Sequence, residues 1–332
     1  MTESSRTFPL GEMAQAVFGP LHRHVAQIQE GFRDPGAPRG APAYRLTFDA
    51  QGDKIIARAG PGVTDADFVR AQRIIDALID QARRKGRVRE GEVLAAIAFS
   101  EGESESNTPM QLPQLGGLTL RTPRQVHYVE ALRDESIDLI FGVGPAGTGK
   151  TFLAVAAAVE ALKQERVDKI IVTRPAVEAG EKLGYLPGDL AEKVDPYLQP
   201  IWDAFRSQMS EGDLKARRER RVIEIAPLAF MRGRTLSNAF VIVDEAQNAT
   251  VLQMKMTLTR LGEGSRMVVT GDPSQIDLVR PDQSGLSHAI SILEDVPGVE
   301  VIRFATQDVV RHRLVAHIVE AYHRDEGARG GS

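Results

Sequence analysis

Gly144-Pro145-Ala146-Gly147-Thr148-Gly149-Lys150-Thr151 decides the fold of this chain, because it matches the P-loop template G-x-x-x-x-G-K-[ST] at every position. An apolar run over 137–143 precedes it, and a helix-forming run over 152–162 follows it. The glycines let backbone N–H groups approach phosphate oxygens, and the start of the helix adds partial positive charge. We therefore expect all eight residues to bind the phosphates of a nucleotide, rather than to form a turn that binds nothing.

Two further features complete a hydrolytic site. Lys150 is expected to reach the β- and γ-phosphates, and the Thr151 hydroxyl to bind Mg²⁺. The apolar strand over 240–243 ends in Asp244 and Glu245, a Walker B pattern. Asp244 is expected to hold Mg²⁺ opposite Thr151, and Glu245 to act as the general base or to orient the attacking water. Such an acid pair alone is usually a solvated strand exit, but behind a P-loop it favours NTP hydrolysis over a metabolite kinase.

Two glutamines are candidates for reading the nucleotide. Gln275 follows the apolar strand 267–270 and would meet the γ-phosphate if that strand lies beside Walker B, so that it could distinguish ATP from ADP. A simple turn at 272–273 is the alternative. Gln125, upstream of the P-loop strand, matches the hydrogen-bonding edge of adenine or merely begins a helix. No guanine-specific [NT]-K-x-D element follows Walker B, which favours ATP.

The composition is that of a globular protein large enough for two domains. The chain has 332 residues, of which 42% are apolar and 26% charged. The absence of cysteine excludes disulfides, Cys-bound zinc and a thiol nucleophile, and suits a reducing compartment. A net charge of −4 means that any nucleic-acid contact must come from local basic patches. With no secretion signal and no apolar run of spanning length, we expect a cytoplasmic protein without membrane contact.

The chain divides into four stretches. Residues 1–100 are expected to form a small α+β module, and residues 101–117 an acidic, turn-prone linker. Residues 118–325 alternate apolar strands with helices, which predicts a mainly parallel, doubly wound α/β domain. Residues 326–332 are expected to be a disordered tail. The expected elements are helices over 11–30 and 65–85, and strands at 44–49, 54–59, 137–143, 169–173, 222–225, 240–243, 267–270 and 299–303.

Two runs of the chain are strongly basic. Residues 83–89 hold five cations at the end of the helix expected over 65–85, and residues 215–221 hold five more. The first run either meets the helix dipole or contacts phosphates, and the second is a solvated helix face or lines the pore of a ring. Neither run has interleaved aromatic residues, so base stacking is poorly provided for.

On these residues the chain resembles the PhoH family of ATPases, in its longer form with an N-terminal KH-like module. The resemblance covers 118–325, and that family is similar to the first ATPase half of superfamily 1 helicases, whose DEAQ and GD-x-x-Q motifs match 244–247 and 271–275. The stretches that carry it are 121–125, 144–151, 172–177, 180–188, 227–236, 243–248, 270–275 and 311–315.

The resemblance implies a single RecA-like P-loop domain that uses ATP and Mg²⁺ in RNA metabolism, including RNA helicase activity. It also implies hexamers and a YbeY-type endoribonuclease or the ribosome as partners. A single RecA-like domain lacks the arginine that a second such domain would supply. The site therefore needs an arginine from a neighbouring subunit. Arg232, Arg234 and Arg311 are the candidates, each with a salt bridge or loop anchor as the alternative, and Arg174 is expected to face RNA or phosphate. The alternative function is an ATP-gated adaptor that docks the endoribonuclease or the ribosome, with slow hydrolysis as a switch.

A KH-like module implies a G-x-x-G loop between two helices. The nearest glycine stretches, 36–40 and 60–62, have the wrong spacing and context. We therefore do not expect RNA binding in the usual KH manner, and expect the module to serve assembly or partner docking.

Overall fold

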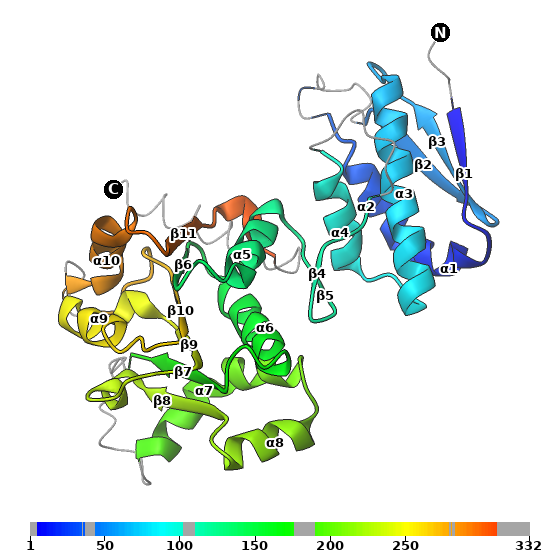
Figure 1. Cartoon of the computed structure of the whole chain (residues 1–332). Helices are drawn as coiled ribbons and strands as arrows, with labels where there is room; N and C mark the ends of the chain where they lie inside the picture. The colour runs from blue at the N-terminus through cyan, green and yellow to red at the C-terminus, as the bar shows by residue number, and fades with distance from the viewer. Residues whose placement is uncertain are drawn as a thin grey trace. The chain divides into compact units, whose positions relative to one another are not determined.

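The computed structural model describes residues 5–34, 36, 44–101, 110–175, 190–278, 280 and 283–310, with residues 190–197 described in backbone only. The chain forms two compact units, residues 1–126 and 127–332 (Figure 1). The tail expected at 326–332 lies outside the described residues, as do residues 102–109 of the expected linker.

The first unit is an α+β module with a three-stranded antiparallel sheet. Strands β1 (Ser5–Pro9), β3 (Lys54–Ala59) and β2 (Leu46–Gln51) lie side by side in that order. Alternate residues, among them Phe8, Phe48 and Ile55, are buried on one face, where helices pack. These helices include α3 (Asp65–Lys85) and α4 (Glu90–Phe99). The helix expected over 65–85 is confirmed, and so are the two expected strands, whereas β1 was not foreseen.

The single helix expected over 11–30 is wrong. The structure has a 3-10 turn (Gly11–Met13), α1 (Ala14–Phe18), a second 3-10 turn (Pro20–His22) and α2 (Arg23–Glu30). Gly19 adopts a φ of +68°, and Pro20 has no N–H to continue the helical hydrogen bonds. Leu21, which a continuous helix would place on the core face, is instead 91% exposed.

The segment that joins the two units packs with the first. It contains a short hairpin of β4 (Gln114–Leu115) and β5 (Leu118–Thr119), and Leu112 belongs to the first unit's core. Helix α5 (Pro123–Arg133) begins in this segment. The contacts thus divide the chain after residue 126, whereas the sequence placed the start of the ATPase domain at 118.

The second unit is built on six parallel strands, and all six were predicted. Their order across the sheet is β11-β6-β10-β9-β7-β8. Their bounds are β6 (Leu139–Val143), β7 (Lys169–Arg174), β8 (Ile223–Pro227), β9 (Ala239–Val243), β10 (Arg266–Gly271) and β11 (Val299–Arg303). The sequences of such strands are nearly continuous apolar runs because both faces of the sheet are covered. The predicted doubly wound α/β fold with a RecA-like P-loop core is confirmed.

Helices cover both faces of this sheet (Figure 1). Helix α6 (Lys150–Lys163) packs against β7, β9 and β10, and α7 (Leu190–Arg206) packs against α6. On the other face α9 (Val251–Leu258) and α10 (Gly285–Leu293) share one apolar core with the strands. Helix α8 (Glu211–Glu219) contacts α7 and the edge strand β8. Among the described helices, none combines the length and the hydropathy needed to cross a membrane.

The carboxyl ends of four strands meet at one edge of the sheet. In the register of the pairing, Val143 lies beside Gly271, Val243 beside Val269, and Thr173 beside Val243. The P-loop, Asp244 and Asp272 therefore leave the sheet at the same edge. Strand β10 separates the P-loop strand from the Walker B strand, so each can present its residues without collision.

Candidate nucleotide-binding site

Three glycines give the P-loop its shape. Gly144, Gly147 and Gly149 have φ angles of +135°, +84° and +86°, which side chains disfavour. A Cβ at Gly144 would also lie 2.3 Å from the Phe304 carbonyl oxygen. Helix α6 starts directly after Gly149, so its first backbone N–H groups face the loop. The loop therefore has the shape that the sequence predicted for phosphate binding.

Lys150 lies across this loop and is buried. Its Nζ donates to the Gly144 and Pro145 carbonyl oxygens at 2.6 and 2.8 Å. The Thr148 hydroxyl donates to the Pro145 oxygen at 3.0 Å and holds the turn closed. Pro145 and Ala146 lie at the partly exposed tip of the loop. A positive charge is thus fixed where phosphate oxygens would approach.

Beside the loop, two hydroxyl groups converge on one buried carboxylate. Asp244 Oδ1 accepts hydrogen bonds from Thr151 Oγ1 at 2.6 Å and from Thr270 Oγ1 at 2.8 Å. Asp244 is 6% exposed, and its position is fixed by its backbone N–H, which donates to the Thr173 oxygen. Hydroxyl and carboxylate oxygens are donors that suit Mg²⁺, so the set fits this ion. Thr270 was not anticipated, although its place at the end of the strand before Asp272 was a usable signal.

Glu245 follows in a left-handed conformation, with φ of +51°. Its Oε2 accepts a hydrogen bond from Gln247 Nε2 at 2.6 Å, and its Oε1 lies 3.7 Å from Arg174 Nη2. Left-handed backbone at a residue other than glycine is a strain that often marks functional sites. Arg174, for which the sequence suggested RNA or phosphate, here lies beside the expected general base.

A hydrogen-bond chain connects Glu245 to the next strand. Gln247 is 2% exposed, and its Oε1 accepts from the Asp272 backbone N–H at 3.0 Å. Gln275 Nε2 donates to Asp272 Oδ2 at 2.7 Å. Strand β10 does lie beside Walker B, as the proposal for Gln275 requires. Gln247 and Asp272 were not singled out as site residues from the sequence. They connect Glu245 to Gln275, which were.

The three arginine candidates differ in their surroundings. Arg234 makes a two-pronged ion pair with Glu224, at 2.7 and 2.8 Å, so it anchors its own loop. Arg232 is exposed, and its side chain has no hydrogen-bond or ion-pair partner among the residues that the structure describes. Arg311 lies outside them.

Gln125 belongs to the first unit. It is 5% exposed, and its Oε1 accepts from the Arg121 backbone N–H at 2.7 Å. Its own N–H donates to the Thr122 hydroxyl at 3.2 Å. These bonds cap the start of α5, which is the helix-start role that the sequence left open beside adenine recognition.

Tyr128 lies buried behind the P-loop strand. A Cβ at Gly142 would come within 3.0 Å of its ring, and the ring meets Phe304 edge-on. Burial raises the pKa of Tyr128, and the charge of Asp244 raises it further. The phenol therefore stays neutral beside the buried carboxylate.

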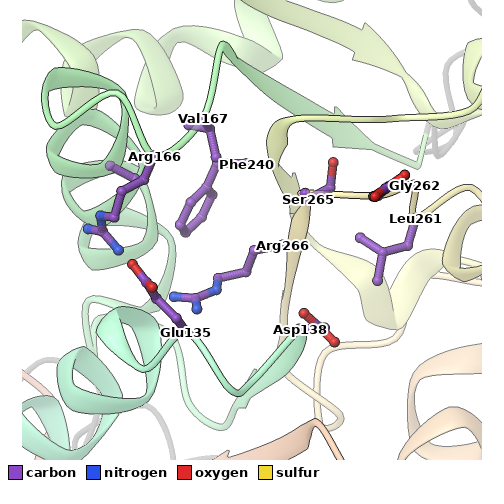
Figure 2. A pocket seen from close by; sticks show the side chains of 12 residues that line it. Glu135, Asp138, Arg166, Val167, Phe240, Leu261, Gly262, Ser265 and Arg266 are labelled. Carbon is purple, nitrogen blue, oxygen red and sulfur yellow. The ribbon is translucent and has the colours of Figure 1, made fainter.

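A separate cavity of about 650 Å³ opens at the opposite edge of the sheet (Figure 2). Glu135, Arg166, Phe240 and Arg266 are among the residues that line it. Arg266 donates to the backbone oxygens of Leu132 and Asp134 at the end of α5, and burial, with Arg166 nearby, lowers its pKa. In open parallel sheets ligands bind at the carboxyl ends of the strands, so this cavity is not the nucleotide site.

The short turn between α1 and α2 is the place where a KH-like module would carry G-x-x-G. It reads Gly19-Pro20-Leu21-His22, with glycine only at the first position. Leu21 and His22 have φ angles of +52° and +57°. This turn therefore does not fit G-x-x-G either.

Sheet order, P-loop and Walker B geometry together define a P-loop NTPase fold. The family model of the PhoH-like protein matches residues 117–323. A PhoH-like protein of Bacillus subtilis (strain 168) is 49% identical over 265 residues, which cover 78% of this chain and 82% of the relative. Protein PhoH of Escherichia coli (strain K12) is 41% identical over 256 residues, 76% and 72% of the two chains. The chain belongs to the PhoH family.

Solved structures show a more distant likeness. The Sulfolobus solfataricus SWI2/SNF2 ATPase core domain has 19% identity and a TM-score of 0.32, covering 58% of this chain and 37% of the other. The Pif1 helicase of Candida albicans has 12% identity and a TM-score of 0.29, covering 56% and 40%.

Proposed function

We propose that this protein is a Mg²⁺-dependent ATPase whose hydrolysis is coupled to RNA metabolism. The observation that carries the proposal is the convergence of Thr151 and Thr270 on buried Asp244, directly beside the P-loop. This set fits Mg²⁺, which when bound would neutralise charge on the phosphates.

The residues around this set divide the work of hydrolysis. Lys150 and the P-loop N–H groups hold the β- and γ-phosphates and offset their negative charge. Glu245 accepts the proton of a water as its oxygen attacks the γ-phosphorus. The bond from that phosphorus to the bridging oxygen breaks, and ADP and phosphate are the products. Gln275, held on Asp272, is placed to respond to the γ-phosphate.

A ring of copies, a hexamer by the family resemblance, would complete the site. Arg232 supports this proposal better than Arg234, because the guanidinium of Arg234 is already paired with Glu224. Arg311 stays a candidate. An arginine that meets the transition-state charge contributes ~10³-fold or more to the rate.

RNA is the proposed ligand that couples to hydrolysis, in the cytoplasm, with a YbeY-type endoribonuclease or the ribosome as protein partner. The second candidate is an ATP-gated adaptor for that endoribonuclease or the ribosome. The contacts of Arg174 and Gln247 with Glu245 favour regulated hydrolysis, which both candidates require.

Steady-state ATP hydrolysis, with and without single-stranded RNA, tests the proposal. Lys150→Ala should abolish hydrolysis, while Lys163→Ala, the same change at the far end of α6, should not. Glu245→Gln should bind ATP but hydrolyse it poorly. Wild-type rates in Lys150→Ala would refute the site. If RNA does not stimulate hydrolysis, and hydrolysis is required to capture the endoribonuclease, the adaptor function replaces the first candidate.

A further inference from the structure

The two basic runs of the sequence have different surroundings in the structure. In the first unit, Arg84 pairs with Asp80 at 3.0 Å and Lys85 pairs with Glu92 at 3.0 Å. Glu92 also accepts from the Arg89 backbone N–H at 2.8 Å. Two of the five cations in this run are therefore paired within their own unit.

The second run has no such partners. Lys215, Arg217, Arg220 and Arg221 lie on α8 and the turn that follows it, and we call them the α8 basic surface. Within the described part of the chain, none of these four side chains has a hydrogen bond or ion pair.

A carboxylate on the following strand is already occupied. Glu224 is the second residue of β8, and both of its oxygens accept hydrogen bonds from Arg234. These bonds lower the pKa of Glu224 against the effect of burial, and the charges of Lys169 and Arg221 add to the lowering. Lys169 and Arg221 therefore face a carboxylate that is paired elsewhere.

Arg218, in the middle of the run, has a structural role. Its guanidinium lies 4.0 Å above the centre of the Trp202 ring, which fixes α8 on α7. Leu214 of α8 is buried as well. Trp202, the single tryptophan, is only 5% exposed, so it offers no platform for stacked bases. The surface presents charge on a fixed helix, without base readout.

We infer that the α8 basic surface binds the phosphodiester backbone of RNA without sequence preference. The inference rests on the proposed coupling to RNA and names where that RNA lies. Arginine forks match the geometry of phosphate oxygens, and three of the four residues are arginine. Contacts to phosphate fix position and carry no sequence information.

The surface is well placed for this role. Helix α8 ends where β8 begins, so its basic end lies at the amino edge of the sheet (Figure 1). The P-loop lies at the carboxyl edge. RNA and nucleotide therefore occupy opposite edges and do not compete.

The test is the salt dependence of RNA binding by the full-length protein, measured by fluorescence anisotropy with labelled oligouridylate. The variant is Lys215→Gln/Arg217→Gln/Arg220→Gln, which leaves Arg221 in place because its φ of +57° suits few substitutions. Each lost contact should reduce the slope of log affinity against log salt by about 0.7, so three lost contacts should reduce it by roughly 2. The affinity should fall roughly 50-fold at physiological salt. ATP hydrolysis without RNA should be unchanged, which shows that the variant folds.

The matched control is Arg83→Gln/Arg84→Gln/Arg87→Gln, which removes the same charge from the first unit. An equal loss in the control, or no loss in the α8 variant, would overturn the inference. If the wild type hydrolyses ATP but binds no RNA, the ATPase proposal stands and the RNA surface fails. Binding of polyglutamate in place of oligouridylate would assign the surface to an acidic protein instead.

Discussion

Replacing Gln247 by leucine tests whether the hydrogen-bond chain beside Walker B positions the general base. Gln247 is 2% exposed, and both ends of its amide are used. Nε2 donates to Glu245 at 2.6 Å, and Oε1 accepts from the Asp272 backbone N–H at 3.0 Å. Leucine has a similar size but neither group, so both contacts are lost while the space stays filled.

Two separate losses follow from this change. The Asp272 N–H is buried and would be left without an acceptor, which costs about 1–3 kcal/mol in the free energy of unfolding. The Glu245 side chain would lose its hydrogen bond from Gln247 and with it its fixed orientation. General-base catalysis contributes about 10²–10⁴-fold. A misplaced base should therefore lower kcat by roughly 10- to 100-fold, with little change in KM.

Gln247→Glu keeps an acceptor for the Asp272 N–H but cannot donate to Glu245, and its carboxylate repels that of Glu245. We expect both variants to lose kcat at saturating ATP. Both should also lose stability in urea unfolding, Gln247→Leu through the unpaired Asp272 N–H and Gln247→Glu through the charge placed at a position that is 2% exposed. If Gln247→Leu hydrolyses ATP at the wild-type rate while losing stability, the residue has no positioning role and the reasoning fails.

Three further changes have definite expected outcomes. Arg234→Ala should lower the free energy of unfolding by about 1 kcal/mol, since the pair with Glu224 is two-pronged but about a third exposed. Because the folded pKa of Glu224 is depressed below 4.5, this contribution is present above that pH and disappears as the pH falls through the folded value. Urea unfolding of both proteins at neutral and acid pH should show a shrinking difference. Gly144→Ala should abolish binding of a fluorescent ATP analogue, because its Cβ would meet the Phe304 oxygen at 2.3 Å, and tight binding would contradict the loop geometry. Arg174→Gln should bind oligouridylate as the wild type does, yet lose RNA stimulation of ATP hydrolysis; retained stimulation would remove Arg174 from the coupling.

Elements with a regular pattern of apolar residues could be predicted from the sequence. The six strands of the second unit are apolar runs with turn signals between them, and the long helix Asp65–Lys85 repeats its apolar residues at helical spacing. The P-loop is a local motif, so its position needs no tertiary information. Strand β1 was missed because five residues with one buried aromatic, Phe8, give too short an alternation. Gly19 and Pro20 are a signal that a helix ends, but the apolar spacing on both sides of them predicted one continuous helix.

The pairing of side chains within the site could not be predicted in this way. The hydroxyl of Thr270 reaches Asp244 only because β10 lies beside β9, and strand order is not written in any local pattern. The partner of Arg234 is likewise set by the path of the loop after β8. The sequence could name candidates for each role, and tertiary structure decides which of them meet.

Strand β7 gives the coupling of RNA to hydrolysis a physical route. It begins at Lys169, next to the α8 basic surface through the hydrogen bond from the Ile170 N–H to the Val222 oxygen. It ends at Arg174, 3.7 Å from Glu245. The four residues between are buried, and the strand is paired with β8 on one side and β9 on the other. A closely packed strand transmits a displacement instead of absorbing it. We propose that the Arg174–Glu245 contact, which is 3.7 Å long and partly exposed, is the element in this route that both sites bias. A physical coupling requires a two-state element of this kind, and for this reason Arg174→Gln should separate RNA binding from RNA stimulation.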